Sequence, residues 1–488
     1  MNNPSIKKNV VLSTAYQMLL LFLPLITAPY ISRVLGVDGV GIYSYTYSIQ
    51  TYFAMFAALG TASYGSREIA RNRDDIHKRS QLFWEIELLT VVTTSLCLIA
   101  WFLLTLFSGT YQIYYMLLSF ALLATMFDIS WLYTGIEQFR YIVLQNSIFK
   151  LLGAAALFLF VKEKDDVPVY VLILSLTTLL VNLSMWIYLP KFVHAVSLKN
   201  IRILPHFKET LVYFLPAVAT SVYTVLDKAL IGWMTDEVSE NGYYEQATKI
   251  VGIAKAITFT SLNNVIGSRM SYLFAQGRND EAKEKIYFSI EYVLFMGFGI
   301  CFGLLGVSAR FVPVFFGNGY EQVITLLYEL SFIVIIIGIS NCLGSQYYNP
   351  AGLRALSAKF IIAGSVVNLM INLVLIPKFK STGAVAASII AELVITGLYL
   401  RYCNGFIRLK DIVRMGKKKL VAALGMLAVV LILDKIIVSD MPALLSEVIA
   451  GMAVYVAMLS ILKDDFIKRC KGLLLQRKDG GKRHGSAD

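Results

Sequence analysis

Residues 10–32 read VVLSTAYQMLLLFLPLITAPYIS and contain no charged side chain. A helix needs about 20 apolar residues to cross the hydrocarbon core of a bilayer, so this segment is long enough to span a membrane. We expect it to be kept as a spanning helix rather than cleaved as a signal peptide. Its apolar part is longer than the ~7–15 residues of a signal core, and no small-residue cleavage site follows a short core.

The rest of the 488-residue chain has the same character, with 57% apolar and only 16% charged residues and a mean hydropathy of +0.65. A soluble domain carries about 25% charged residues, so this composition excludes a disordered chain and a soluble enzyme with one anchor. We predict an all-α integral membrane protein with fourteen spans. The predicted spans are 10–32, 40–64, 81–107, 111–133, 142–161, 168–189, 209–233, 243–268, 286–308, 321–344, 357–377, 382–403, 419–438 and 443–462.

The distribution of Lys and Arg predicts the orientation of these spans. If residues 1–9 are cytoplasmic, 34 of the 44 basic residues fall in cytoplasmic segments, seven in outer segments and three inside spans. Lys150 is counted among the cytoplasmic ones, in the segment 134–150. Because cytoplasmic loops are enriched in Lys and Arg, we expect a multi-pass protein with both termini in the cytoplasm. This bias also explains the net charge of +12 without nucleic acid as a partner.

An internal repeat is visible at matching topological positions. Gly65-Ser66-Arg67 ends the second predicted span, and Gly267-Ser268-Arg269 ends the eighth, while Gly41 and Gly242 lie near their outer ends. Parallel repeats of this kind are common in transporters, where two lobes flank a central cavity. The repeat predicts two pseudo-symmetric six-helix lobes followed by an addition. The predicted domains are an N-lobe at 1–208, a C-lobe at 209–403, two further spans at 404–462 and a basic cytoplasmic tail at 463–488.

Three lysines lie inside predicted spans, where a charged group costs at least about 2.5–3.5 kcal/mol and needs a partner, a cavity or an interface. Lys228 is close enough to the outer end to reach the interface. Lys249 follows Glu245 at the favourable i, i+4 spacing, so a private ion pair and a contact with substrate are both open. Lys255 lies near mid-membrane with no acid within four positions, which leaves a water-filled cavity or an ion pair with Glu392 of the twelfth span.

Arg33, Arg67 and Arg269 lie at span ends, where headgroup anchoring is the ordinary role of a basic residue. Symmetric positions facing one cavity would instead form a ladder of cations. Such a ladder suits a pyrophosphate, which Arg binds through a planar fork and Lys as a point charge.

Two further groups of residues are candidates. The acids that a proton- or sodium-coupled transporter would use, or that form structural ion pairs, are Asp128, Asp227, Glu245 and Glu392. Tyrosines are typical of the membrane interface but also stack on sugar rings. The candidates for stacking are Tyr43, Tyr45, Tyr47, Tyr223, Tyr243 and Tyr244. The five cysteines and four histidines show no metal-ligand spacing, so we expect no metal site.

Several motifs, taken in order, carry a resemblance to a known family. They are the run Pro24-Leu25-Ile26-Thr27-Ala28-Pro29-Tyr30-Ile31-Ser32-Arg33-Val34-Leu35-Gly36 followed by Gly39-Val40-Gly41-Ile42-Tyr43, the Gly60…Gly65-Ser66-Arg67-Glu68 segment, the Trp131…Gly135…Gln138-Phe139 segment and Asp227-Lys228. The set resembles the polysaccharide-transporter (Wzx-type flippase) branch of the multidrug/oligosaccharidyl-lipid/polysaccharide exporter superfamily, which includes the MATE-like fold. The likeness extends over essentially the whole chain.

The resemblance implies a flippase that moves an undecaprenyl-pyrophosphate-linked oligosaccharide from the inner to the outer leaflet of a bacterial plasma membrane by alternating access. It implies a cationic cavity, to which we assign Arg33, Arg67, Lys228, Lys249, Lys255 and Arg269. The expected partners are the lipid-linked substrate, membrane lipids, and a polysaccharide polymerase with glycosyltransferases. We expect no cofactor and no ATP site, because there is no P-loop, so coupling falls to H⁺, Na⁺ or the membrane potential.

Two other functions remain open. A multidrug exporter of the same superfamily would favour acidic residues deep in the lobes and usually twelve spans. A membrane-embedded glycosyl- or acyltransferase or a polymerase should show a large polar loop with carboxylates or a histidine, whereas the loops here are short and basic.

Overall fold

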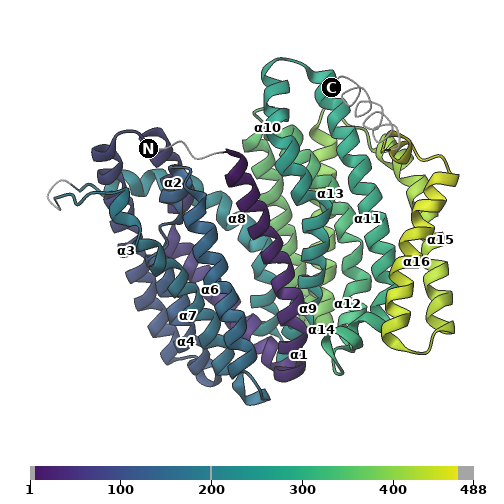
Figure 1. Ribbon diagram of the computed structural model, residues 1–488, viewed down its shortest axis with the longest axis horizontal. Helices are drawn as coiled ribbons and strands as arrows, with labels where there is room; N and C mark the ends of the chain where they lie inside the picture. The colour runs from purple at the N-terminus through teal and green to yellow at the C-terminus, as the bar shows by residue number, and fades with distance from the viewer. Residues whose placement is uncertain (1–5, 198–200, 471–488) are drawn as a thin grey trace, which may run out of the picture. The chain divides into compact units, whose positions relative to one another are not determined.

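The computed structural model describes residues 6–197 and 201–470, which are helical with short connections and contain no β-strand. Within these ranges some side chains, including that of Tyr223, lie outside the described part. The helices are shown in Figure 1. Their bounds are α1 Ile6–Ala58, α2 Thr61–Arg71, α3 Ile76–Leu106, α4 Gln112–Met126, α5 Ser130–Gly135, α6 Phe139–Phe160, α7 Val167–Trp186, α8 Leu204–Met234, α9 Val238–Lys255, α10 Ser261–Ala275, α11 Asn279–Phe316, α12 Glu321–Ser331, α13 Ile333–Leu343, α14 Arg354–Tyr402, α15 Leu409–Ile436 and α16 Asp440–Ile461. Short 3₁₀ turns lie at Gly109–Tyr111, Lys164–Asp166 and Leu189–Lys191, and π-turns at Ala256–Thr260 and Gly344–Tyr348.

Each predicted span falls on a helical stretch, but two pairs of spans are joined without a loop. In α1 the break between the first two spans is a single residue, Gly36, with φ of 69° and ψ of 179°. In α14 the break is Lys380, whose φ is 51°. By length and composition, nine helical stretches in the described residues can cross a membrane, and two of these contain the breaks at Gly36 and Lys380. The all-α membrane fold is confirmed, while the count of fourteen spans stays a prediction.

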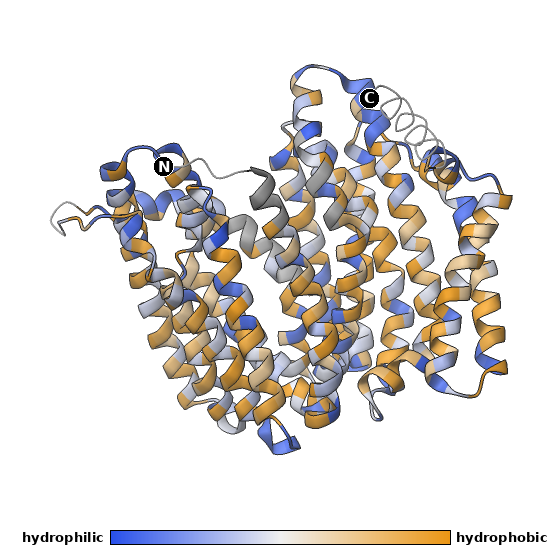
Figure 2. Ribbon diagram, in the orientation of Figure 1, coloured by the Kyte–Doolittle hydropathy of each residue, from blue (hydrophilic) through white to orange (hydrophobic). Residues whose placement is uncertain are grey.

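The outward faces of these helices are apolar. On α3, Leu96, Phe102 and Leu106 are 62%, 50% and 67% exposed, and large aliphatic side chains are exposed along most other long helices. Figure 2 shows hydrophobic residues along the lengths of the helices and hydrophilic ones gathered at helix ends and loops. A water-soluble protein rarely exposes apolar surface on this scale, so these faces contact lipid and the chain is a multi-pass membrane protein.

The chain divides into two compact units, Met1–Glu245 and Gln246–Asp488. The predicted lobe boundary lies earlier, after residue 208, whereas α8 packs against α1, α2 and α3. His206 at the start of α8 explains part of this attachment. Its two ring nitrogens lie 2.7 Å from the Tyr64 hydroxyl of α2 and 2.8 Å from the Glu85 carboxylate of α3. The lobes themselves, which rest on the repeat, stay a prediction.

Aspartates in the loops of the first unit bind backbone N–H groups next to the helix starts. Asp75 caps α3, because its carboxylate accepts a hydrogen bond from the backbone N–H of Lys78 at 3.0 Å. Asp166 accepts from the backbone N–H groups of Lys162 and Glu163 in the same way. These hydrogen bonds favour the charged carboxylates and hold the pKa of each Asp below its usual value.

In the second unit, Arg310 of α11 joins the last two helices to the rest of the bundle. Its guanidinium donates to the Asp434 carboxylate at 2.8 Å and to the backbone carbonyls of Asp434 and Ile437 at 2.7 and 2.9 Å. It also lies 3.5 Å from the Glu447 carboxylate of α16, whose side chain is fully buried. The last carbonyls of α15, which have no partner inside the helix, are therefore bound by a cation.

Candidate functional site

The two glycines at equivalent positions of the repeat meet each other's helices. The second half of α1 crosses the start of α9, and a Cβ on Gly41 would lie 2.1 Å from the backbone oxygen of Val238. A Cβ on Gly242 would lie 2.2 Å from the backbone oxygen of Val37. Both pairs of equivalent residues, 37 with 238 and 41 with 242, differ by 201 positions, so one contact is made twice. Glycine is required here because the two backbones touch, as at small-residue crossings in other membrane helices.

An ion pair lies beside this crossing and joins three helical segments. The Lys228 ammonium of α8 lies 2.6 Å from Oε2 of Glu245 in α9, and the Ser44 hydroxyl of α1 donates to the same oxygen at 3.0 Å. The Glu245 side chain is 10% exposed and that of Lys228 is 24% exposed. In this low-dielectric position the two opposite charges offset each other. Glu245 therefore has a cationic partner on another helix, and the local pairing with Lys249 that the sequence left open stays open.

The neighbouring acid on α8 is also bound within the first unit. Asp227 is 3% exposed, and its Oδ2 accepts a hydrogen bond from the Tyr244 hydroxyl of α9 at 2.6 Å. Successive residues of α8 therefore contact successive residues of α9, since Asp227 contacts Tyr244 and Lys228 contacts Glu245. The two contacts fix the register of the two helices.

The tyrosines predicted to stack on sugar form part of the same region. Tyr43 and Tyr47 stack on each other with ring centroids 5.2 Å apart. Tyr43 also packs edge-to-face against Tyr170, with ring centroids 5.0 Å apart. Tyr45 packs against Tyr111 instead, at 5.2 Å. Tyr243 is half-buried in α9, whereas the side chain of Tyr223 lies outside the described part.

The three predicted arginines lie on exposed surfaces. Arg33 lies just before the break in α1, Arg67 donates to the Tyr213 hydroxyl of α8, and Arg269 lies 3.2 Å from the Glu281 carboxylate of α11. Lys249 and Lys255 are half-buried on α9, and Lys255 is the residue directly before the π-turn Ala256–Thr260. Such π-turns are frequent at functional sites because they re-aim side chains within a helix.

The other two candidate acids have short-range partners. Asp128 accepts a hydrogen bond from the backbone N–H of Ser130 at 3.0 Å, which starts α5. Glu392 is 3% exposed and accepts from the Ser340 hydroxyl at 3.1 Å. Glu87 was not a candidate, although it is 2% exposed, interacts electrostatically with Asp128, and has no hydrogen bond to its carboxylate oxygens in the described part of the chain.

The sequence analysis places Lys150 in two ways, because the predicted span 142–161 contains it while the basic-residue tally counts it as cytoplasmic. The tally is wrong, since α6 begins at Phe139 and Lys150 lies half-way along this membrane helix. At 1.5 Å per residue it is about 16 Å from the start of that helix. The polar residues that precede it, Gln145 and Asn146, belong to the helix rather than to a loop. The apolar run from Leu151 to Phe160 continues the same helix, and this continuity was the signal available in the sequence.

Groups in the described residues do not form a metal centre, since no cluster of three His, Cys, Asp or Glu side chains is found there. The arrangement instead offers paired charges, hydroxyls and aromatic rings inside apolar helices. These are groups that bind and release a polar cargo without covalent chemistry.

Comparison with known proteins identifies the family. A family model described as "Polysaccharide biosynthesis protein" matches residues 6–274, more than half of the chain. The chain belongs to this family. An Escherichia coli K12 protein named "Putative O-antigen transporter" is 25% identical over 411 residues, covering 82% of this chain and 97% of that protein. The resemblance found from the motifs is therefore confirmed.

Solved structures of two transporters share the fold of this family member. The structure named "Lipid II flippase MurJ, inward closed conformation" aligns with a TM-score of 0.74 and 17% identity, over 94% of this chain and 99% of that chain. The MATE multidrug transporter DinF-BH, solved as a ligand complex, aligns with a TM-score of 0.55 and 16% identity, over 84% of this chain and 98% of that chain. At these identities the likeness concerns the fold alone. With the family match and the E. coli relative, it identifies the chain as a membrane transporter.

Proposed function

We propose that this chain flips a lipid-linked oligosaccharide from the inner to the outer leaflet of a bacterial plasma membrane during surface polysaccharide synthesis. The family match over residues 6–274 carries the proposal, and the E. coli relative that spans 82% of the chain supports it. The lipid is undecaprenyl pyrophosphate. Glycosyltransferases would build the unit before transport, and a polymerase would use it afterwards.

The physical task is to carry a hydrated head group through hydrocarbon. Burying an amide or hydroxyl without a hydrogen bond costs roughly 2–7 kcal/mol, so a sugar unit with many hydroxyls cannot cross unaided. A protein path with polar side chains keeps these groups hydrogen-bonded while the lipid tail stays in the bilayer. Alternating exposure of this path to the two leaflets completes the transfer, driven by H⁺, Na⁺ or the membrane potential.

The six basic residues differ in how readily they can bind the pyrophosphate. The charge of Lys228 is offset by Glu245 at 2.6 Å, so a phosphate at Lys228 would have to compete with that carboxylate. Arg67 and Arg269 already bind Tyr213 and Glu281 at exposed positions. Of the six basic residues assigned to the cargo, we place Lys255 first because it precedes a π-turn deep within a predicted span.

The coupling acids belong to the same proposal. Asp227 and Glu392 are buried within membrane helices, and Asp128 is half-buried in the connection between α4 and α5. In such positions a carboxylate gains or loses a proton at a large solvation cost. Each accepts a hydrogen bond from a neighbour described above. A change in that contact during transport would alter the affinity of the acid for H⁺ or Na⁺.

Complementation tests the function. A bacterium lacking its own O-antigen flippase would express this chain, and surface polysaccharide and lipid-linked units would be measured. We expect the chain to restore export and Lys255→Ala to abolish it with lipid-linked units accumulating. The control Lys359→Ala, at an exposed lysine of α14, should export normally. Normal export by a membrane-inserted Lys255→Ala variant would overturn the role of Lys255. Drug efflux without polysaccharide export would instead favour a multidrug exporter.

A further inference from the structure

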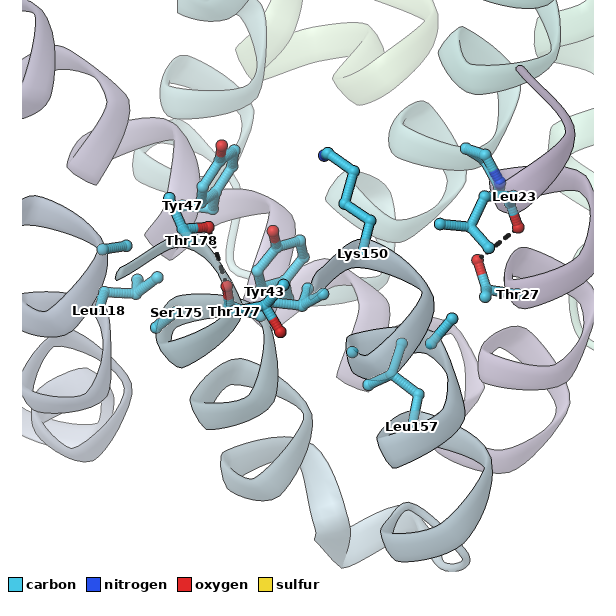
Figure 3. Close-up of a pocket in the computed structure, with 15 residues that line it drawn as sticks. Leu23, Thr27, Tyr43, Tyr47, Leu118, Lys150, Leu157, Ser175, Thr177 and Thr178 are labelled. Atoms are coloured by element: carbon cyan, nitrogen blue, oxygen red, sulfur yellow. Dashed lines mark hydrogen bonds between the residues drawn. The ribbon is translucent and has the colours of Figure 1, made fainter. Parts of the chain in front are cut away.

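A cavity of about 250 Å³ lies in the first unit, lined by residues of α1, α4, α6 and α7. Its walls are mostly aliphatic, but Lys150, Tyr43, Tyr47 and Ser175 also line it. In Figure 3 the Lys150 side chain extends from α6 into the space between the two tyrosines on one side and Leu23 on the other. Tyr47 is 43% exposed, so this wall of the cavity reaches the surface of the chain.

Lys150 carries the only charge among the residues that line this cavity. In the described part of the chain its ammonium has no ion pair and no hydrogen bond, unlike Lys228, which lies 2.6 Å from Glu245. Outside the lining, Glu245 acts on both Tyr43 and Tyr47, and its charge is offset by Lys228 at 2.6 Å. An ammonium in apolar surroundings is costly without a counter-charge. The cavity therefore lacks one negative charge.

The hydroxyls in the cavity also suit an anion. Thr27 and Thr178 donate their hydrogens to backbone carbonyls of their own helices, at 3.1 and 2.9 Å. Ser175 is 1% exposed and its hydroxyl has no hydrogen-bond partner in the described part of the chain. The Tyr43 hydroxyl likewise makes no hydrogen bond there. The groups without a hydrogen bond in the described part of the chain thus include the ammonium of Lys150 and the hydroxyls of Ser175 and Tyr43.

The size of the space limits the ligand. One water needs about 10–15 Å³ of cavity and drug-sized ligands occupy roughly 300–1,000 Å³, so about 250 Å³ holds a single sugar ring or a small anion with water. The stacked pair of Tyr43 and Tyr47 offers a flat aromatic wall beside the ammonium.

We propose that the Lys150 cavity is a binding site for one monovalent anionic group, either the carboxylate of an acidic sugar or a free halide. Lys150 supplies the counter-charge, and Ser175 and Tyr43 donate hydrogen bonds. The sugar form rests on the proposed flippase function, because the carboxylate would then belong to the cargo. The halide form does not depend on it.

Direct binding to the purified full chain tests the site. The probes are radiolabelled glucuronate, radiolabelled chloride and, as a neutral sugar of the same size, radiolabelled glucose. We expect saturable binding of at least one anion, at least tenfold weaker in Lys150→Met and retained in Lys150→Arg. Ser175→Ala should weaken binding by a smaller factor. The matched control is Lys162→Met, which removes an exposed lysine just beyond the end of α6 and should bind like the parent chain.

The arms of the experiment separate the two sources of the anion. Glucuronate that displaces chloride and binds more tightly supports the sugar form, and chloride binding that glucuronate does not displace supports the halide form. Equal binding to Lys150→Met, or glucose binding as tightly as glucuronate, overturns the proposal, as does the absence of binding by both anions. Failure of the complementation test with Lys150-dependent chloride binding intact would refute the flippase function but not the anion site.

Discussion

Replacing Gly242 by alanine tests the helix crossing in the first unit. The new Cβ would lie 2.2 Å from the backbone oxygen of Val37, about 1.1 Å inside an ordinary C···O contact of about 3.3 Å. The obstacle is backbone, which cannot rotate away as a side chain does, so α1 and α9 must separate by about 1 Å. Overpacking of this kind costs about 1–3 kcal/mol, while the better helix propensity of alanine returns about 0.5–1 kcal/mol. We therefore expect a net loss of about 1–2 kcal/mol.

Thermal unfolding of the purified chain in detergent measures this loss. For a unit of roughly this size, each 1 kcal/mol shifts Tm by about 2–4 °C, so Gly242→Ala should lower Tm by about 2–8 °C. Gly252, in the same helix, is the matched control, because a Cβ there would meet no atom within 4 Å. Gly252→Ala should leave Tm unchanged or raise it. The double variant Gly41→Ala/Gly242→Ala should lose less than the sum of its parts, since helices separated once accommodate both methyl groups. A Gly242→Ala variant as stable as Gly252→Ala would refute the crossing.

Three further predictions concern charged groups. Arg310→Met should destabilise the second unit by about 3–5 kcal/mol, seen as a lower Tm, because it leaves buried Glu447 without its cation. Asp75→Ala should lower Tm at neutral pH because it removes the cap of α3. Folding lowers the pKa of Asp75, so the cap stabilises the fold fully above the ordinary pKa of 3.8. This stabilisation disappears as the pH falls through the lower pKa of the folded state. Lys228→Met and Glu245→Gln should each lower Tm more than the double variant, which removes both members of the ion pair.

Matched changes make these predictions specific. Arg71→Ala removes an exposed ion pair with Glu68 and should cost less than about 1 kcal/mol, so an equal loss in Arg310→Met would argue against the clamp. Asp75→Asn keeps a capping side chain that does not titrate and should show a Tm close to the parent at neutral pH. A double variant at Lys228 and Glu245 that loses the full sum of the single effects would show that the two charges do not depend on each other.

The sequence predicts the helices well because apolar length is a property of the chain alone. Each of the fourteen apolar runs corresponds to a helical stretch, and the breaks at Gly36 and Lys380 fall where outer connections were expected. A hydropathy run does not show how few residues a connection needs, so the absence of a loop on either side of Gly36 was not foreseen. The basic-residue tally misplaced Lys150, although the predicted span 142–161 contains it, because a polar helical turn and a polar loop have the same composition.

The candidate site was predicted in its residue types but not in its contacts. The sequence identifies Glu245 and Lys228 as intramembrane charges, yet their pairing connects two helices and depends on how α8 and α9 pack. The repeat identified Gly41 and Gly242 as equivalent, and only the coordinates show that each meets the backbone of the other's helix. Equivalent residues of the repeat do not always make equivalent contacts. Gly65 packs against Trp131, whereas a Cβ on its counterpart Gly267 would meet no atom within 4 Å.

The hydrogen bond between Ser44 and Glu245 lies at a special place in the doubled chain. The two residues differ by 201 positions, the same interval that relates Gly41 to Gly242, so they occupy equivalent positions of the predicted repeat. In a dimer of identical halves that position would meet its own copy, and a glutamate there would face a second glutamate at hydrogen-bond distance, with strong like-charge repulsion. Joining the halves in one chain lets the two copies differ. A serine then donates a hydrogen bond to the glutamate, whose charge Lys228 offsets at 2.6 Å, an arrangement that no exact homodimer can have.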